Sequence, residues 1–361
     1  MKSIKVCHIT SAHPPEDIRI FTKECCSLAK AGYEVSLVEP GGSYQKNGVN
    51  IIGTGEIPGN RLKRMSASAK KAYETVADMD FDIVHIHDPE LLPYGLKLKH
   101  KNKIVIFDSH EDVSAQIMDK PWIPKQLRPL VSKAYRDYET KIVRQLDGVI
   151  AATEHIAKTF ENRTPYVETI NNYPLLDDIK FQTSPFQERN KYIAYAGGVS
   201  TIRGIEVMEE AAQRIDGKMV IACDHAVEEK GNIIYRGKTN REGVNELYGQ
   251  SRAGIIIYQP AGNHIESQPI KLFEFMAAGL PVVASDFPLW QTIVKGNDCG
   301  ICVNPCNAAE VADACQKLID DPQEAQRLGR NGRKAVEEKY SWASEETKLL
   351  SFYRTLWENK K

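Results

Sequence analysis

Short apolar runs alternate with longer amphipathic stretches along the chain, and this alternation predicts parallel β-sheets covered by helices. In the first half, apolar runs predict strands at 4–10, 34–38, 49–53, 82–87, 103–108 and 147–152. A helix over residues 18–31 is predicted by four apolar residues at helical spacing, Ile18, Phe21, Cys25 and Leu28. Asp17 precedes this helix and can cap it. The fold class is therefore α/β, with one doubly wound domain over residues 1–165.

A second domain is predicted after a change in composition. Residues 166–190 are rich in Pro, Asn, Gln and Asp and show little hydrophobic period, which is typical of a linker. A second alternating series then predicts strands at 192–196, 218–223, 232–235, 253–258, 281–284 and 300–303. We expect this domain to cover residues 191–344. The terminal helix over 345–361 carries an apolar stripe made of Leu349, Phe352, Tyr353 and Leu356.

Composition and charge narrow the class of protein. The length of 361 residues suits two domains of ordinary size. The chain is 42% hydrophobic and 26% charged, which excludes a disordered chain, a collagen-like repeat and a coiled coil. The 47 Lys and Arg residues nearly balance the 48 Asp and Glu residues, and the net charge of -1 gives no general attraction to nucleic acid. Any basic surface for a partner must therefore be local.

Targeting and cysteine patterns indicate a reducing compartment. No apolar run reaches the roughly 18 residues of a spanning helix, and Lys5 and His8 interrupt the apolar start of the chain. We therefore expect a cytoplasmic protein. The eight cysteines, which include the neighbours Cys25 and Cys26, are distributed like reduced thiols. The run from Cys299 to Cys306 lacks a clear fourth ligand, so we expect no metal there.

The first candidate site is a glycine turn between a strand and a helix. Its sequence is Gly197-Gly198-Val-Ser-Thr-Ile-Arg203-Gly204. Glycine lets the backbone approach a ligand, the helix N-terminus favours an anion, and Arg203 offers a fork of donors suited to phosphate oxygens. Neither G-x-G-x-x-G nor a P-loop pattern occurs, which disfavours nicotinamide-type binding and P-loop hydrolysis. The alternative is a tight turn with an exposed arginine.

The second candidate site joins a loop to a helix. Glu266 precedes Pro269, which suits the first turn of a helix, and Lys271 and Glu274 lie on one helical face. The opposite face is expected to meet the core through Ile270, Phe273 and Ala277. Two carboxylates so placed can bind different hydroxyls of one polyhydroxy ligand, with Lys271 near its phosphates. The alternative is a Lys–Glu surface pair of little energetic weight.

The two candidate sites together resemble those of a known enzyme family. Glu266-x7-Glu274 followed by FMAAGLPVVAS resembles the acidic signature of family 4 retaining glycosyltransferases, and the turn from Gly197 to Gly204 resembles their diphosphate-binding turn. Four further motifs resemble the bacterial branch of surface-polysaccharide and cell-envelope assembly: HPPEDIRIFTKE (13–24), HIHDPELLP (85–93), FDSHED (107–112) and DGVIAATEHI (147–156). Their order and spacing extend the likeness over most of the chain.

The resemblance implies a GT-B fold, in which two Rossmann-like domains face an interdomain cleft and the terminal helix crosses back to the N-terminal domain. The second domain would bind the nucleotide sugar and the first would bind the acceptor. By position, Glu274 would hold the ribose hydroxyls, Glu266 a hydroxyl of the donor sugar, and Arg203 the diphosphate. His110 would face the donor sugar from the first domain, and its alternative is a structural histidine at a strand end.

The chain departs from the family pattern at two places, one in the phosphate turn and one after the first strand. Many members have a basic residue after the first glycine of the phosphate turn, where this chain has Gly198, and Lys271 is expected to supply the missing cation. The glycine pair that many relatives carry after the first strand is replaced by residues 13–19. The candidates for the acceptor site are His13, Asp17, Arg19, His87 and Asp88. The alternatives are a capping Asp17 and a solvated Arg19.

The chemistry is expected to need no metal. Asp80-Phe-Asp82 has the D-x-D form of another glycosyltransferase fold, but it precedes a strand and so lies at the edge opposite to the ligand-binding edge. His85 and His87 share one strand face, and no downstream His/Asp set completes a metal site. We expect these histidines to pack at the strand end near the acceptor. No cofactor is expected besides the donor substrate.

A basic segment is the candidate for membrane contact. Residues from Arg61 to Lys71 carry five basic and no acidic side chains, and they can form a helix suited to anionic lipid headgroups. Trp122 lies in a loop bounded by prolines. We expect peripheral contact with the inner face of the cell membrane and a lipid-linked acceptor. The alternative is a solvated helix face.

The expected activity follows from the resemblance. The enzyme would transfer a hexosyl or N-acetylhexosaminyl group from a nucleotide-diphosphate sugar, with UDP as the expected nucleotide, to a saccharide or lipid-linked saccharide in surface polysaccharide assembly. Retention would proceed by front-face attack, with the leaving phosphate oxygen accepting the acceptor's proton. Arg203 and Lys271 would stabilise the departing diphosphate. Two alternatives stay open: a sugar-nucleotide epimerase on the same fold, and a non-catalytic glycan-binding partner.

Overall fold

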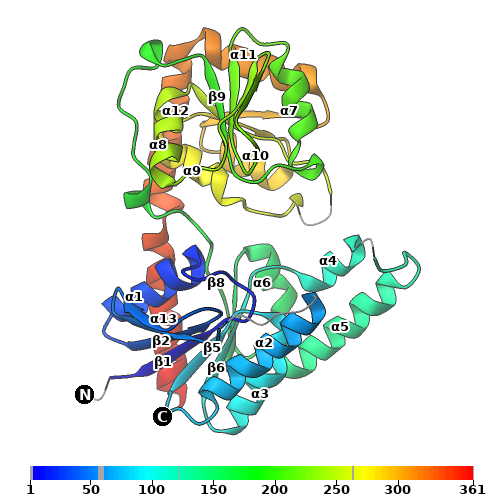
Figure 1. Ribbon diagram of the computed structural model, residues 1–361, viewed down its shortest axis with the longest axis vertical. Coiled ribbons are helices and arrows are strands. Elements are labelled where there is room, and N and C mark those ends of the chain that lie inside the picture. The colour runs from blue at the N-terminus through cyan, green and yellow to red at the C-terminus, as the bar shows by residue number, and fades with distance from the viewer. Residues whose placement is uncertain (1–2, 56–60, 121, 262–263, 361) are drawn as a thin grey trace. The chain divides into compact units, whose positions relative to one another are not determined.

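The chain forms two compact units (Figure 1). The computed structural model describes residues 3–55, 61–120, 122–261 and 264–360, without the side chains of 61–64. The first unit consists of Met1–Asn172 together with Ala343–Lys361, and the second consists of Tyr173–Trp342. Each unit contains its own sheet and its own apolar core.

The first unit contains an eight-stranded sheet in the order β3-β4-β2-β1-β5-β6-β7-β8. Every neighbouring pair is parallel except β3 and β4. The strands are β1 (Lys5–Ile9), β2 (Glu34–Glu39), β3 (Tyr44–Lys46), β4 (Val49–Gly53), β5 (Ile83–Ile86), β6 (Ile104–Ser109), β7 (Gly148–Ala151) and β8 (Val167–Thr169). The central strands are buried on both faces, which explains their continuous apolar sequences.

Helices connect these strands as the alternation predicted. They are η1 (Ile18–Cys25), α1 (Cys26–Lys30), α2 (Arg61–Val76), η2 (Pro89–Leu91), α3 (Leu92–His100), α4 (Val113–Asp119), α5 (Arg128–Val143), α6 (Glu154–Phe160) and α13 (Trp342–Lys360). Figure 1 shows α4 and α5 as neighbouring helices at one side of this unit. Of α13, the residues from Ala343 onward belong to the first unit. The predicted apolar stripe of α13 is buried: Leu349, Phe352, Tyr353 and Leu356.

The second unit repeats the architecture with seven strands in the order β11-β12-β10-β9-β13-β14-β15. Only β11 is antiparallel to its neighbour. The strands are β9 (Tyr192–Ala196), β10 (Lys218–Ala222), β11 (Glu228–Lys230), β12 (Ile233–Tyr235), β13 (Ala253–Ile256), β14 (Val282–Ser285) and β15 (Gly300–Val303). The helices are η3 (Leu176–Asp178), η4 (Phe186–Glu188), η5 (Thr201–Arg203), α7 (Ile205–Ala212), α8 (Arg241–Gln250), α9 (Ile270–Ala278), α10 (Pro288–Val294), α11 (Ala308–Asp320) and α12 (Pro322–Lys339).

The strand orders place a topological switch point in each unit. In the first unit the chain runs outward from β1 in one direction and from β5 in the other, and in the second unit β9 and β13 have the same relation. Ligands of open α/β sheets bind beyond the carboxyl ends of strands at such points. We therefore expect ligand-binding residues directly after β1, β5, β9 and β13.

The boundary between the units corrects the expected linker at 166–190. Residues 167–169 form β8 in the first sheet, so the first unit extends to Asn172. Residues 173–190 belong to the second unit, where Ile179 and Phe186 are buried in its core. The composition of this segment suggested an exposed connection because its few apolar residues have no regular spacing.

The first helix differs from the expected amphipathic α-helix. Asp17 caps it as predicted, accepting hydrogen bonds from two backbone amides, but residues 18–25 form a π-helix. Its bonds join residues five apart, which brings Arg19 and Glu24 onto one buried face. Ile18, expected in the core stripe, is 47% exposed. The other three predicted positions, Phe21, Cys25 and Leu28, are buried.

Candidate functional site

The glycine turn directly follows β9 in the second unit. Gly197 has a φ of 132°, a backbone conformation that residues with a Cβ atom rarely adopt. The carbonyl oxygen of Gly198 accepts two hydrogen bonds, from the Tyr195 hydroxyl at 2.7 Å and from the Arg203 guanidinium at 2.9 Å. The turn is therefore held by its own side chains, with the arginine folded over it.

Gly204 requires glycine for two separate reasons. Its φ of 75° is left-handed, and an added Cβ would lie 1.9 Å from the carbonyl oxygen of Ile257. The backbone that follows β13 thus passes directly against the start of α7. This close approach fixes the turn at the switch point between β9 and β13.

Lys271 reaches the same turn from the first turn of α9. An ideal Cβ on Gly197 would lie 2.5 Å from the Lys271 ammonium nitrogen, so the lysine side chain occupies the space beside that glycine. Burial lowers the pKa of Lys271, the charge of Arg203 lowers it further, and Glu274 acts in the opposite direction. Within the described ranges, neither Lys271 nor Arg203 has a carboxylate at ion-pair distance. Two cations therefore converge on the glycine turn without a protein anion between them.

Glu274 lies one turn further along α9 and is 7% exposed. Its Oε1 forms an ion pair of 2.8 Å with Arg241, the first residue of α8. This pair ties the start of α8 to the first turns of α9. Local sequence patterns did not predict the role of Arg241, because its partner Glu274 lies on the next helix.

The surroundings of α9 correct one expectation and leave another untested. The helix is buried on nearly every side from Leu272 to Ala278, whereas Ile270, expected in the core, is only partly buried. Its mean hydropathy exceeds that of an amphipathic surface helix because it packs between strands and α12. Glu266 lies on an exposed turn before α9, and its role stays a prediction.

In the first unit, Asp88 organises the loop that follows β1. One carboxylate oxygen accepts hydrogen bonds from the Thr10 hydroxyl at 2.8 Å and the Ser11 amide at 2.6 Å. The other oxygen lies 3.1 Å from Nδ1 of His13. Burial acts to raise the pKa of Asp88, but these partners hold it well below its usual range. Asp88 and His13, both acceptor-site candidates, are thus brought together.

Asp108, at the end of β6, connects three further candidates. Arg19 donates to both of its oxygens at 2.9 Å, and the rings of His87 and His110 lie 3.3 and 3.1 Å from Oδ2. Against the effect of burial, the Arg19 charge and the two rings keep the pKa of Asp108 low. Arg19 is 4% exposed, so the alternative of a solvated arginine is wrong.

His110 is the member of this network that remains partly exposed. Its side chain is 21% exposed, while Asp108 behind it is completely buried. Its ring centroid lies 4.9 Å from that of His13, so the carboxyl ends of β1 and β6 present two imidazoles side by side. These rings are placed to exchange hydrogen bonds with a hydroxylated ligand.

A buried cluster behind this network has the residue types of a metal site. His8, Glu24, His85 and His87 place ligand atoms within 4.8 Å of one another, and His87, Asp108 and His110 do the same. Sequence reasoning sought partners only after His87, whereas the fold supplies His8 and Glu24 from the chain before it. The imidazoles already have hydrogen-bond partners within the protein. Nδ1 of His8 lies 2.9 Å from Nε2 of His87, and Nδ1 of His85 lies 2.8 Å from the Tyr353 hydroxyl. Burial lowers the pKa of each, that of His87 to about 4.

Other sequence features lie away from both sites. Asp82 accepts a hydrogen bond from the Lys5 amide at the amino end of the first sheet, as the D-x-D argument required. The basic segment Arg61–Lys71 lies on α2, but its first four side chains fall outside the described residues. Among the helices that the structure describes, none combines the length and apolar character needed to cross a bilayer.

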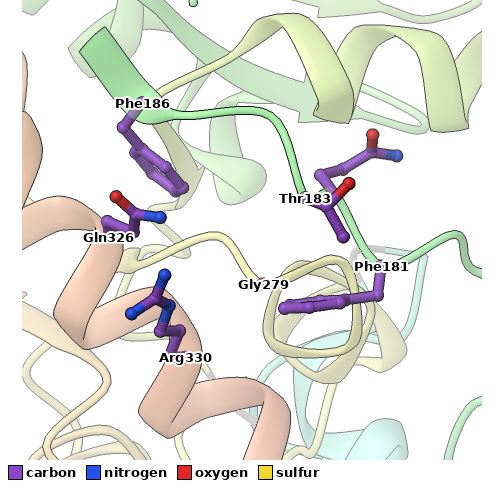
Figure 2. Close-up of a pocket in the computed structure, with 7 residues that line it drawn as sticks. Phe181, Thr183, Phe186, Gly279, Gln326 and Arg330 are labelled. Atoms are coloured by element: carbon purple, nitrogen blue, oxygen red, sulfur yellow. The ribbon is translucent and has the colours of Figure 1, made fainter.

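Figure 2 shows a separate small pocket in the second unit, with a volume of about 110 Å³. Phe181 and Arg330 line it beside Gly279, which ends α9. Lys271 and Glu274 lie on the first turns of the same helix, so this pocket belongs to the opposite end of α9 from the glycine turn.

Two Rossmann-like units, each with polar groups at its switch point, define a GT-B protein. Residues 22–172 match the family described as Glycosyltransferase Family 4, and residues 177–335 match the family described as Glycosyl transferases group 1. The phosphatidyl-myo-inositol mannosyltransferase of Mycobacterium leprae is 33% identical, over 91% of this chain and 87% of that protein. The chain belongs to the family 4 glycosyltransferases.

Solved structures show the same fold at low identity. Sucrose-phosphate synthase of Thermosynechococcus elongatus superposes with a TM-score of 0.79 at 17% identity, covering 99% of this chain and 100% of that one. HepE of Anabaena, in complex with UDP and glucose, has a TM-score of 0.72 at 10% identity, covering 98% of this chain and 100% of that one. These likenesses agree with the GT-B fold expected from the sequence.

Proposed function

We propose that this chain transfers a hexosyl or N-acetylhexosaminyl group from a nucleotide-diphosphate sugar to a saccharide or lipid-linked saccharide, with retention and without a metal ion. The observation that carries the proposal is the pair of cations, Arg203 and Lys271, at the glycine turn after β9. Two like charges held close in a partly buried site repel each other, and a diphosphate between them removes that repulsion.

The proposed donor site extends from the phosphates in both directions. Glu274, oriented by Arg241, accepts hydrogen bonds from the ribose hydroxyls through its second oxygen, and Glu266 binds a hydroxyl of the transferred sugar. His110 hydrogen-bonds to that sugar, with its ring held by the buried Asp108. Support for a hexose and a lipid-linked acceptor comes from the M. leprae relative, named a phosphatidyl-myo-inositol mannosyltransferase. The HepE complex supports UDP as the nucleotide.

In the proposed reaction, the bond from the anomeric carbon to the leaving phosphate oxygen breaks and a bond to the acceptor oxygen forms on the same face. The acceptor's proton moves to that phosphate oxygen, so no protein nucleophile is needed. Arg203 and Lys271 stabilise the negative charge that develops on the diphosphate. Glu266 orients the sugar and does not attack it.

The test is calorimetric binding of UDP and GDP sugars that carry glucose, mannose or N-acetylglucosamine. We expect one of them to bind, and we expect Arg203→Ala to weaken it by about 10- to 100-fold, as the loss of a charged hydrogen bond would do. Arg214→Ala is the matched control, because Arg214 is a half-exposed cation beyond the same helix, paired with Glu210. Unchanged affinity in Arg203→Ala contradicts the proposed site.

Product analysis separates the proposal from its alternatives. We expect turnover only when an acceptor is present. NMR should show that the anomeric carbon of the product has the same configuration as in the donor. Activity should stay complete after EDTA treatment. Isomerisation of the donor without an acceptor would instead identify an epimerase. Absence of binding across the whole panel would favour a non-catalytic partner.

A further inference from the structure

Exposed apolar side chains gather on one part of the first unit. Thirteen large apolar side chains are exposed in the described part of the chain, and six of them lie within residues 118–138. They are Met118 (42%), Trp122 (66%), Leu127 (50%), Leu130 (66%), Val131 (38%) and Tyr138 (43%). Single exposed apolar residues are ordinary on protein surfaces, but such a concentration marks an interaction surface.

Three of these six residues form a stripe with Ala134 that begins at the residue before α5 and runs along the helix. Leu127, Val131, Ala134 and Tyr138 follow the i, i+4, i+7, i+11 spacing of one helix face, and all four are exposed. The residues that α5 buries, Glu139, Ile142 and Val143, occur only in its last turns. Ile142 lies four residues after Tyr138 and continues the stripe, so the stripe is buried at the C-terminal end of α5 and meets solvent along the rest of the helix.

Hydrogen bonds tie the start of α5 to α4 and to a residue shortly before α5. Arg128 donates to the carbonyl oxygens of Ile123 at 2.8 Å and Met118 at 3.0 Å, and the Ser132 hydroxyl donates to Ser114 at 2.8 Å. These bonds join the two helices into a hairpin, which Figure 1 shows at the edge of the first unit. We call residues 113–143 the α4–α5 hairpin.

The charge of the α4–α5 hairpin identifies what its apolar face would meet. Residues 118–138 contain five basic side chains and two acidic ones, a local charge of +3 in a chain of net charge -1. Lys120 makes a cation–π contact with Trp122, with its ammonium nitrogen 5.2 Å from the ring centroid. Tryptophan and leucine flanked by basic residues suit the interface of a bilayer that contains anionic phospholipid.

We propose that the α4–α5 hairpin docks on an anionic phospholipid bilayer, with the apolar stripe and Trp122 among the headgroups and the basic side chains at the lipid phosphates. This surface is distinct from the basic segment 61–71 that sequence reasoning favoured. The attraction between basic side chains and lipid phosphates is screened by ions, so binding is reversible and weakens with salt. Docking does not depend on sugar transfer, and it is measured without a donor.

Co-sedimentation with vesicles tests the proposal. The intact protein is mixed with vesicles of phosphatidylcholine alone or of phosphatidylcholine with phosphatidylglycerol. We expect binding to the anionic vesicles only, and a loss of about tenfold in Trp122→Glu/Leu130→Glu and in Lys125→Glu/Lys133→Glu. Val227→Glu is the matched control, because Val227 is 79% exposed in the second unit, outside the hairpin.

Donor binding by calorimetry, measured on each variant, shows that the variants are folded and separates failure of this proposal from failure of the proposed function. Brominated lipid should quench the fluorescence of the wild type more than that of Trp122→Phe. The proposal is overturned if the wild type stays in the supernatant, if the hairpin variants sediment like Val227→Glu, or if these variants change only the oligomeric state, which would assign the surface to a protein partner.

Discussion

At the scale of single residues, Lys271 carries a charge that its surroundings disfavour. Its pKa lies below the usual value because burial and Arg203 oppose the ammonium, and a bound diphosphate would reverse that effect. The free site therefore loses a proton from Lys271 at a lower pH than the occupied site does. This linkage makes donor affinity a function of pH.

We predict that donor affinity falls as the pH rises from about 7 to about 9.5, because deprotonation of Lys271 removes one of the two cations. Lys271→Gln should bind the donor more weakly at about pH 7 and should show a smaller change with pH. Calorimetric titration at both pH values gives the comparison. Equal pH dependence in wild type and variant would remove Lys271 from the phosphate site.

The pKa of His13 is raised, whereas that of Lys271 is lowered. Burial acts to lower its pKa, but the hydrogen bond and charge of Asp88 raise it above the usual value. The folded state therefore binds the proton more tightly than the unfolded state does. The resulting stability is fully present below about pH 6.5 and is lost as the pH rises through the raised pKa.

We predict that His13→Gln destabilises the protein at about pH 6 and has a smaller effect at about pH 9. Urea unfolding at both pH values measures this difference. His100→Gln serves as the control, since His100 is an exposed histidine at the end of α3. An effect of His13→Gln that does not vary with pH would show that the ion pair with Asp88 contributes nothing to stability.

At the scale of elements, the turn between β9 and α7 depends on Gly204. We predict that Gly204→Ala costs more than about 1 kcal/mol of unfolding free energy and weakens donor binding, because its left-handed φ and the carbonyl of Ile257 leave no room for a methyl group. Gly42→Ala is the control, since an added Cβ there meets no atom within 4 Å. A Gly204→Ala variant with wild-type stability and affinity would contradict the close approach.

The π-helix shows where sequence patterns stop predicting. A period of 3.6 residues correctly predicted a helix, its Asp17 cap and most of its core positions, but it placed Ile18 inside. The wider turn brought Arg19 and Glu24 inward instead, where Asp108, on a strand 89 residues after Arg19, provides a partner. Local spacing carries no information about such a distant partner, so the burial of these two polar side chains could not be predicted from the sequence.

A similar limit applied to the donor site. Gly197, Arg203 and Lys271 could be selected from the sequence because glycine turns and helix starts have local signatures, and the fold brings these three together. The ion pair of Glu274 with Arg241 could not, because it joins two helices through the tertiary structure. The short strands β3, β8 and β11 were missed because their three residues are mostly polar, whereas the equally short β12 is apolar and was predicted.

Glu24 provides a test of the π-helix packing. Burial and the Asp108 charge raise the pKa of Glu24 well above its usual value, so the native state binds a proton at this carboxyl more tightly than the unfolded state does. This proton uptake lowers stability as the pH rises from about 5 to about 8. We predict that Glu24→Gln removes that decline, and urea unfolding at the two pH values will measure it. A steeper decline in the variant would show that Glu24 is ionised in the native state.

At the scale of the whole molecule, the first unit is built from both ends of the chain. The Tyr353 hydroxyl on α13 lies 2.8 Å from His85 and 3.1 Å from His8, on two neighbouring strands. We predict that Tyr353→Phe destabilises this unit by about 1–3 kcal/mol, because both imidazoles lose a buried hydrogen-bond partner. Calorimetric unfolding measures the loss, and unchanged donor affinity would be its companion result. An unaltered melting profile would contradict the role of this hydroxyl.

Because α13 belongs to the first unit, it also affects the order in which the two units can fold during synthesis. Translation releases residues 1–172 before residues 173–342, yet the first unit lacks the part of α13 that belongs to it until residues 343–360 have been synthesised. The second unit has every one of its strands at an earlier moment and can close on its own. The unit whose synthesis begins first is therefore completed after the other, and until then the apolar side chains that α13 covers are open to chaperones.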